Sequence, residues 1–110
     1  MKNLIGGRLV DASDGKVIEV TNPATGELID TVPNATEQDV DMCVKEAAKA
    51  QKEWAKMPMH ERGDILYKFF DLVEAKAEEL AQLLSKETGK PIKEARGEIG
   101  NTRSFVYGYV

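Results

Sequence analysis

Residues 1–35 show the short, roughly alternating apolar pattern that is typical of β-strands. Two runs that are rich in β-branched residues, Val17–Thr21 and Leu28–Val32, flank the segment Asn22-Pro23-Ala24-Thr25-Gly26. Proline fixes φ and glycine supplies a positive φ, so this segment predicts a turn and the two runs predict a β-hairpin. Residues 4–10 are candidates for a third, shorter strand, which residues 11–15 separate from the hairpin.

Residues 36–110 instead show helical spacing, and the pattern predicts three helices. The first begins at Thr36, because Asp39 follows three residues later and the two form a capping-box pattern, with Asp in place of the usual Glu. This helix carries acidic residues in its first turn and lysines near its end, as the helix dipole favours. Its buried stripe is predicted to be Val40, Cys43, Val44, Ala47, Ala48 and Trp54.

The second predicted helix has the clearest periodicity in the chain. It begins near Pro58 and ends at Thr88-Gly89, with Gly89 as the residue that stops it and Pro91 just beyond. Its apolar positions recur every three or four residues: Leu66, Phe69, Phe70, Val73, Ala77, Leu80, Ala81 and Leu84. The third helix opens at Pro91, and one face of it carries Ile92, Ala95, Ile99, Thr102, Val106 and Tyr109.

Two features of this pattern suggest that further chain completes the fold. The pairs Phe69-Phe70 and Leu83-Leu84 widen the apolar face of the second helix beyond what two neighbouring helices would cover. The segment 105–110 is almost entirely apolar or aromatic and has no cap. Because soluble proteins rarely finish on an exposed apolar helix, we expect a continuation after Val110.

Composition and charge narrow the class of protein. The chain has 110 residues, of which 42% are hydrophobic and 31% charged, and its net charge is −4. This composition predicts a single globular domain or part of one. No basic tract is present to neutralise phosphates and no apolar run reaches the ~20 residues that span a bilayer, so neither nucleic acid nor a membrane is expected as a partner. One cysteine and a start without a targeting pattern favour the cytoplasm.

Few residues offer chemistry on their own. Cys43 lies on the apolar side of the first helix among acidic neighbours, which disfavour a thiolate, so we interpret it as a small core residue. His60 has no nucleophile or carboxylate set around it and is interpreted as an exposed or locally bonded histidine. Gly97 and Gly100 lower helix propensity on one turn, which indicates close approach by another backbone or by a ligand.

Several stretches together resemble the amino-terminal part of the NAD(P)-dependent aldehyde dehydrogenase superfamily. They are Val20-Thr21-Asn22-Pro23-Ala24-Thr25-Gly26-Glu27; Asp39-Val40-Asp41 and the helix to Trp54; Arg62 with Ile65-Leu66; Leu80-Ala81; and Glu87-Thr88-Gly89-Lys90-Pro91 followed by Glu94-Ala95. Each motif is weak alone, but this order and these separations are specific, and the resemblance covers essentially all 110 residues.

The resemblance implies that residues 1–110 are a partial domain, an α+β fragment of an α/β enzyme. Its hairpin and helices would be the front of a cofactor-binding domain, and they would pack against a Rossmann-like sheet contributed later in the chain. The parent enzyme would oxidise an aldehyde to a carboxylate with NAD or NADP, through a thiohemiacetal and a thioester on a cysteine beyond residue 110. It would be a homo-oligomer, and this chain alone would be inactive; Cys43 inherits no catalytic role.

The resemblance also carries two sets of candidate site residues. The backbone carbonyls of Val20 and Thr21 and the carboxylate of Glu87 correspond to ligands of a structural monovalent cation, although Glu87 could equally be an ordinary helix-terminal carboxylate. Gly97 and Asn101 correspond to positions that face the substrate tunnel, where an arginine at the second position accompanies phosphorylated aldehydes. Asn101 therefore argues against a phosphorylated substrate.

An alternative interpretation is a freestanding helical protein-interaction module whose exposed Leu/Phe stripe binds a partner. This alternative requires the segment to be stable and functional by itself.

Overall fold

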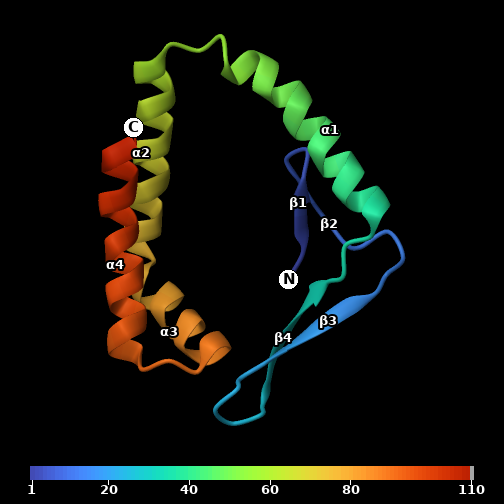
Figure 1. Ribbon diagram of the computed structural model, residues 1–110, viewed down its shortest axis with the longest axis vertical. Coiled ribbons are helices and arrows are strands. Elements are labelled where there is room, and N and C mark those ends of the chain that lie inside the picture. The colour runs from blue at the N-terminus through green and yellow to red at the C-terminus, as the bar shows by residue number, and fades with distance from the viewer. Residues whose placement is uncertain (110) are drawn as a thin grey trace. The chain divides into compact units, whose positions relative to one another are not determined.

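In this computed structural model, residues 1–109 are described, with the side chains of all of them except Arg103, Tyr107 and Tyr109. The described chain has four strands followed by four helices (Figure 1): β1 Asn3–Ile5, β2 Arg8–Val10, β3 Val17–Thr21, β4 Leu28–Pro33, α1 Glu37–Trp54, α2 Met59–Ala75, α3 Ala77–Thr88 and α4 Ile92–Tyr109. Two compact units result. The first comprises residues 1–21 and 28–57, and the second comprises residues 22–27 and the chain from Pro58 onward.

The predicted hairpin is confirmed as β3 and β4, which pair antiparallel with Val17 opposite Pro33. The turn between them is built on Asn22, whose backbone N–H donates to the Glu27 carbonyl at 2.8 Å and whose Oδ1 accepts the Ala24 N–H at 2.9 Å. The register shifts between Val20 and Thr21, because Ile29 of β4 is an extra residue between the partners of these two positions.

The expectation of one extra strand in residues 4–10 is corrected, because this region forms a second hairpin. β1 and β2 pair antiparallel in a sheet of their own, with Leu4 opposite Leu9. Gly6 and Gly7 have φ of 56° and 76°, which a two-residue hairpin turn with two left-handed positions requires. The glycine pair therefore divides this region into two strands.

The predicted capping box at the start of α1 is confirmed, and its carboxylate reaches further than the motif requires. Asp39 Oδ2 accepts the backbone N–H of Thr36 at 2.9 Å and the backbone N–H of Ser13 at 3.0 Å. Thr36 Oγ1 in turn accepts the Asp39 N–H at 3.2 Å. The Thr36 and Ser13 backbone donors hold the pKa of Asp39 below its ordinary value. Asp39, with only 4% of its surface exposed, thus joins the loop after β2 to the first turn of α1.

The prediction of a buried stripe on α1 is wrong for this chain. Val40 and Val44 are 52% and 61% exposed, Cys43, Ala47 and Ala48 are exposed, and only Trp54 is half-buried. Within the described residues of the first unit, α1 packs mainly on β1, which has three residues. A strand of that length cannot cover an 18-residue helix, so most of the apolar side of α1 stays open.

The single long helix predicted from Pro58 to Thr88 is in fact two helices. Lys76 leaves the helical conformation with φ −107° and ψ 13°, and its N–H donates to the Val73 carbonyl. No glycine or proline marks this break. α3 turns away from α2 and packs against α4 (Figure 1), where Ala81 and Ala95 are fully buried. The fold class is as predicted, but the described residues contain four helices instead of three.

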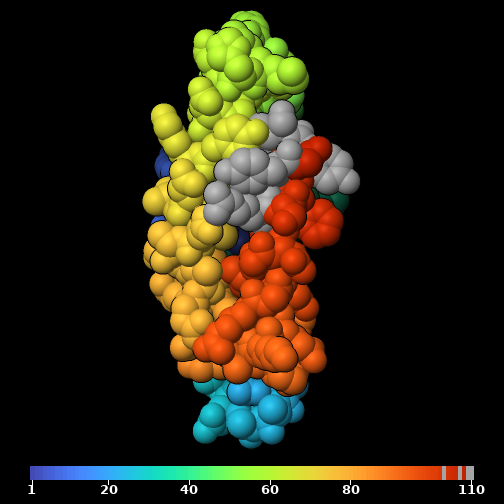
Figure 2. All heavy atoms as spheres, turned by 90° about the vertical axis from the view of Figure 1, so that its left-hand side faces the viewer, coloured from blue at the N-terminus to red at the C-terminus, as the bar shows by residue number. Residues whose placement is uncertain are grey.

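A salt bridge secures the packing of α3 on α4. Glu78 accepts two hydrogen bonds from the Arg96 guanidinium, both of 2.8 Å, and a third from Gln82. These bonds, those of Arg96 first, lower the pKa of Glu78 to about 2. Figure 2 shows α4 beside α2 and α3 on one face of the second unit. The predicted stripe of α4 is confirmed at Ile92, Ala95, Ile99, Thr102 and Val106, whereas the Tyr109 side chain and Val110 lie outside the described residues.

The end of α3 follows the prediction, and it also makes a contact that the sequence did not indicate. Gly89 has φ 72° and its N–H donates to the Ser85 carbonyl, as expected of a left-handed helix stop. A Cβ placed on Gly89 would lie 2.9 Å from Cγ of Pro23, which is in the same compact unit. Gly89 therefore serves two purposes: it adopts a left-handed conformation and leaves room for the β3–β4 turn.

The buried apolar core is small. Only Ile5, Ala12, Ala81 and Ala95 are buried hydrophobic residues among those described, and no large side chain is fully buried. None of the described helices combines the length and apolar character that crossing a membrane would need.

We expect Asp39 to stabilise the first unit in a pH-dependent way. Because its pKa is lowered on folding, its contribution is fully present above its ordinary value of 3.8 and is lost as the pH falls through the folded-state value. Asp39→Ala should lower the midpoint of urea denaturation at neutral pH, and the difference from wild type should shrink below about pH 4. Asp39→Asn should lower this midpoint by less, because Oδ2 alone accepts all three hydrogen bonds and the asparagine amide keeps one acceptor oxygen. Asp41→Asn, an exposed change on the same helix, is the control and should leave the midpoint unchanged.

We expect Gly89→Ala to lower the free energy of unfolding by more than the left-handed backbone conformation alone accounts for. The backbone term is about 1–2 kcal/mol, and the clash with Pro23 adds to it. Gly26→Ala is the matched control, because Gly26 has φ 77° and no atom within 4 Å of an added Cβ. Pro23→Ala should restore part of the loss in Gly89→Ala, as measured by urea denaturation. Equal losses for Gly89→Ala and Gly26→Ala would contradict the contact.

Candidate functional site

The two predicted tunnel residues lie on one exposed side of α4. Gly97 and Asn101 are one helical turn apart and both are exposed. A Cβ added at Gly97 or at Gly100 would meet no described atom within 4 Å. The close backbone approach that these glycines indicated is therefore absent from the described part of this chain. Their side of α4 is open to a neighbour or a ligand.

The three predicted cation ligands lie on two elements. Val20 and Thr21 are at the end of β3, where the bulge disturbs the ladder with β4. The extra residue at this point is Ile29 of β4, whereas Val20 and Thr21 stay paired with Asp30 and Leu28. Glu87 is exposed in the last turn of α3. Each position has the oxygen that a hard cation prefers.

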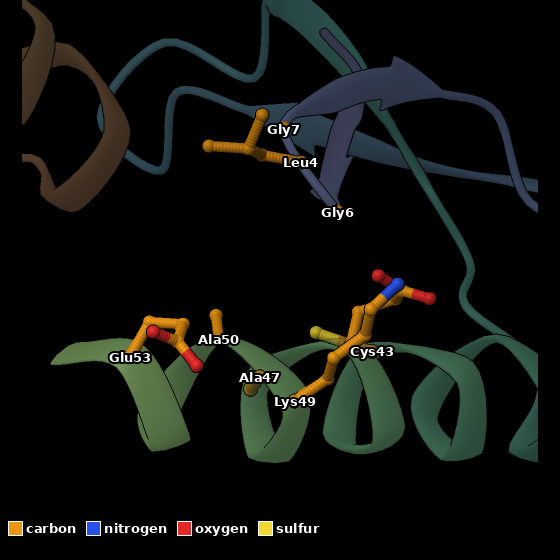
Figure 3. Close-up of a pocket in the computed structure, with 9 residues that line it drawn as sticks. Leu4, Gly6, Gly7, Cys43, Ala47, Lys49, Ala50 and Glu53 are labelled. Carbon is orange, nitrogen blue, oxygen red and sulfur yellow. The ribbon is translucent and has the colours of Figure 1, made fainter. Parts of the chain in front are cut away.

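Cys43 is exposed, which corrects its interpretation as a core residue. It lines a cavity of about 500 Å³ between the β1–β2 hairpin and α1 (Figure 3), with Leu4 on the strand side and Ala47 and Ala50 beside it on the helix. The remaining lining residues are Gly6, Gly7, Glu46, Lys49 and Glu53. The cysteine is exposed for the same reason as Val40 and Val44: nothing among the described residues covers this side of α1.

The other candidates agree with their modest interpretations. His60 is exposed at the beginning of α2, as expected. Among the residues that the structure describes, no three His, Cys, Asp or Glu side chains are grouped so that they could hold a metal ion. Gly97 and Asn101 share α4, whereas Val20 and Thr21 belong to one compact unit and Glu87 to the other, so the described residues assemble no complete candidate site.

Two segments that are distant in sequence meet at Gly89. The turn Asn22–Gly26 contacts the stop of α3 through Pro23. Ser85 Oγ donates to the Lys90 carbonyl at 2.7 Å and Thr88 Oγ1 donates to the Leu84 carbonyl at 2.6 Å, and both bonds fix the end of the helix. The sequence analysis treated these segments as separate motifs. Their shared content of proline and glycine was the available signal that each needs a defined backbone.

Comparison with known proteins gives a consistent result. Residues 9–110 match the family model described as the aldehyde dehydrogenase family. Malonate-semialdehyde dehydrogenase 1 of Geobacillus kaustophilus is 46% identical over 99 residues, which are 90% of this chain and 20% of that protein. The mitochondrial succinate-semialdehyde dehydrogenase of Arabidopsis thaliana is 39% identical over 98% of this chain and 20% of its own length.

Solved structures agree in fold. The aldehyde dehydrogenase of Brucella melitensis biovar abortus 2308 superposes with a TM-score of 0.91 at 44% identity, covering 94% of this chain and 21% of that one. 3,6-Anhydro-L-galactose dehydrogenase in complex with NAP gives a TM-score of 0.91 at 38% identity, and the match covers 94% of this chain and 22% of that one.

The chain spans about a fifth of the length of the relatives that it matches. The family match supports the first interpretation of the sequence and not the freestanding interaction module. Both the resemblance of the motifs and the superposed fold lead to one conclusion: the chain belongs to the aldehyde dehydrogenase family and corresponds to an amino-terminal segment of it.

Proposed function

We propose that this chain is the amino-terminal portion of an NAD(P)-dependent aldehyde dehydrogenase, and that the whole enzyme oxidises an aldehyde to a carboxylate. The family match over residues 9–110, on a chain a fifth as long as its relatives, carries this proposal. The relatives' names support an aldehyde substrate, and the NAP complex of one structural neighbour supports NAD or NADP as the cofactor.

The residues of this chain do not fit a dinucleotide by themselves. Gly6 and Gly7 form a hairpin turn and Gly97 and Gly100 lie inside α4, so neither pair forms a phosphate-binding loop before a helix. We therefore assign no catalytic step to residues 1–110. The chain contributes structure: two hairpins, three packed helices and the open apolar side of α1, which the remaining four-fifths of the enzyme would cover.

A monovalent cation at the end of β3 is the first detailed proposal. The register shift beside Val20 and Thr21 is the observation that supports it, because the ladder is irregular where these two residues would offer their backbone carbonyls as ligands. The exposed carboxylate of Glu87 would complete part of the shell, and its charge would offset that of the cation.

A role of α4 in admitting substrate is the second detailed proposal. The open space around Gly97 and the exposure of Asn101 are consistent with a surface that lines a passage. Asn101 is uncharged, so this position favours an aldehyde without a phosphate. We further propose a cytoplasmic homo-oligomer with a small-molecule substrate and without a nucleic-acid or membrane partner.

An activity assay tests the main proposal. The 110-residue chain should not reduce NAD or NADP with malonate or succinate semialdehyde, whereas the polypeptide made from the complete coding region should. The readout is the absorbance of the reduced nicotinamide. Failure of the complete polypeptide with every aldehyde and both cofactors would overturn the proposal.

Two variants of the complete polypeptide test the site residues in the same assay. Gly97→Leu should raise KM for the aldehyde more than it lowers kcat, since it would narrow the passage, and Lys93→Leu on the same helix is the control. Glu87→Gln should reduce the stabilisation that Na⁺ or K⁺ gives over tetramethylammonium in thermal unfolding. An unchanged KM or an unchanged cation effect would remove the corresponding proposal.

A further inference from the structure

The side of α4 that carries Gly97 and Asn101 places one acidic residue next to Asn101. On a helix, the surface neighbours of a residue are those three and four positions away. For Asn101 these positions are Gly97, Glu98, Ser104 and Phe105, and of these four Glu98 alone is charged. All five residues are exposed. The carboxylate of Glu98 therefore sets the local charge beside Asn101.

This carboxylate has a partner that lies outside α4. Lys90, in the loop between α3 and α4, donates a hydrogen bond from Nζ to Glu98 Oε1, and the two side chains form an ion pair. The backbone carbonyl of Lys90 accepts the Ser85 hydroxyl at 2.7 Å, which fixes the loop at this residue. The Lys90 side chain is 24% exposed and that of Glu98 55%, so the lysine is anchored on the protein while the carboxylate faces solvent.

The other described charges on α4 lie further from Asn101. Lys93 and Glu94 are about two turns before it, and their charges are opposite. Arg96 lies about 140° around the helix from Asn101, and it forms its own ion pair with Glu78 of α3. The ion pair beside Asn101 is therefore a different one from the pair that joins α3 to α4.

We infer that Lys90 is a specificity-determining residue: by neutralising Glu98, it allows aldehydes that carry a negative group to pass Asn101. The inference rests on the proposed role of α4 in admitting substrate. An unpaired carboxylate at this position would repel an anionic aldehyde and would leave a neutral one unaffected. Lys90 removes that repulsion, but because it is itself paired it offers no free cation to hold a phosphate. The pair therefore agrees with the uncharged side chain of Asn101.

The test compares two aldehydes with the same number of carbons in the complete polypeptide: succinate semialdehyde, which is anionic, and butanal, which is neutral. The readout is the ratio of their kcat/KM values, anionic over neutral, because a loss of folded enzyme lowers both values equally. Lys90→Met should lower this ratio by about two- to tenfold, since it leaves Glu98 unpaired. Glu98→Gln should raise the ratio, since it frees the charge of Lys90. The double variant should return close to the wild-type ratio.

Two controls separate an effect of charge from an effect on structure. Arg96→Met removes the ion pair with Glu78, away from Asn101, and should leave the ratio unchanged. Raising the ionic strength from about 0.01 to 0.15 M shortens the screening length from about 30 to 8 Å, so it should return the ratio of Lys90→Met toward the wild-type value. A merely structural role of Lys90 would produce neither this salt dependence nor opposite shifts in the two single variants.

The outcomes distinguish this inference from the proposed function. Oxidation of both aldehydes with one ratio in all variants would overturn the inference and leave the proposed function standing, and so would a wild-type polypeptide that oxidises butanal but not succinate semialdehyde. If butanal is not a substrate, kcat/KM for succinate semialdehyde should fall in Lys90→Met at low salt and recover at high salt, and a fall that salt does not reverse would contradict the inference. Failure with every aldehyde and both cofactors would overturn the proposed function and the inference with it.

Discussion

The carboxylate of Asp39 is the contact on which the first unit depends. It lies at the junction of the loop after β2, the extended residue Thr36 and the first turn of α1. There it accepts hydrogen bonds from the backbone N–H groups of Ser13 and Thr36. Helix N-termini leave four N–H groups without partners, and a buried end without acceptors is costly. With so few buried apolar residues in this unit, polar bonds at the ends of elements define its geometry more than packing does.

In the second unit, polar bonds again fix the ends of the elements, and the packing of buried side chains contributes more than in the first. Ala81 and Ala95 let α3 and α4 approach closely, and the Arg96 fork on Glu78 fixes the position of one helix along the other. Gly89 then sets the direction in which the chain leaves α3, and the space it leaves admits Pro23. The alanine contact, the Arg96–Glu78 pair and the space at Gly89 each depend on the size or shape of one side chain. A change at any of these positions therefore acts on the arrangement of whole elements.

The sequence predicted those features that are determined locally. The Thr36–Asp39 box, the turn at Asn22–Gly26 and the stop at Gly89 each follow from the conformational preferences of a few neighbouring residues. The break at Lys76 was missed because no local signal marks it, and it depends on how α3 packs against α4. The stripe of α1 was misjudged for a different reason. Periodicity identifies an apolar side, but whether that side is buried depends on what lies next to it.

The family motifs and the proposed site residues differ in the same way: the motifs fix the local backbone, whereas the site residues depend on their position in the fold. Two motifs identify the family: Asn22-Pro23-Ala24-Thr25-Gly26 and Thr88-Gly89-Lys90-Pro91. Both consist largely of residues that fix backbone conformation, and Pro23 of the first lies against Gly89 of the second. Such motifs mark an architecture. The residues proposed to face a cation or a substrate, by contrast, are ordinary in type and gain their meaning only from position on β3, α3 and α4. The backbone-fixing motifs of this segment therefore identify its family and its fold, whereas they carry no information about which aldehyde the proposed enzyme would accept.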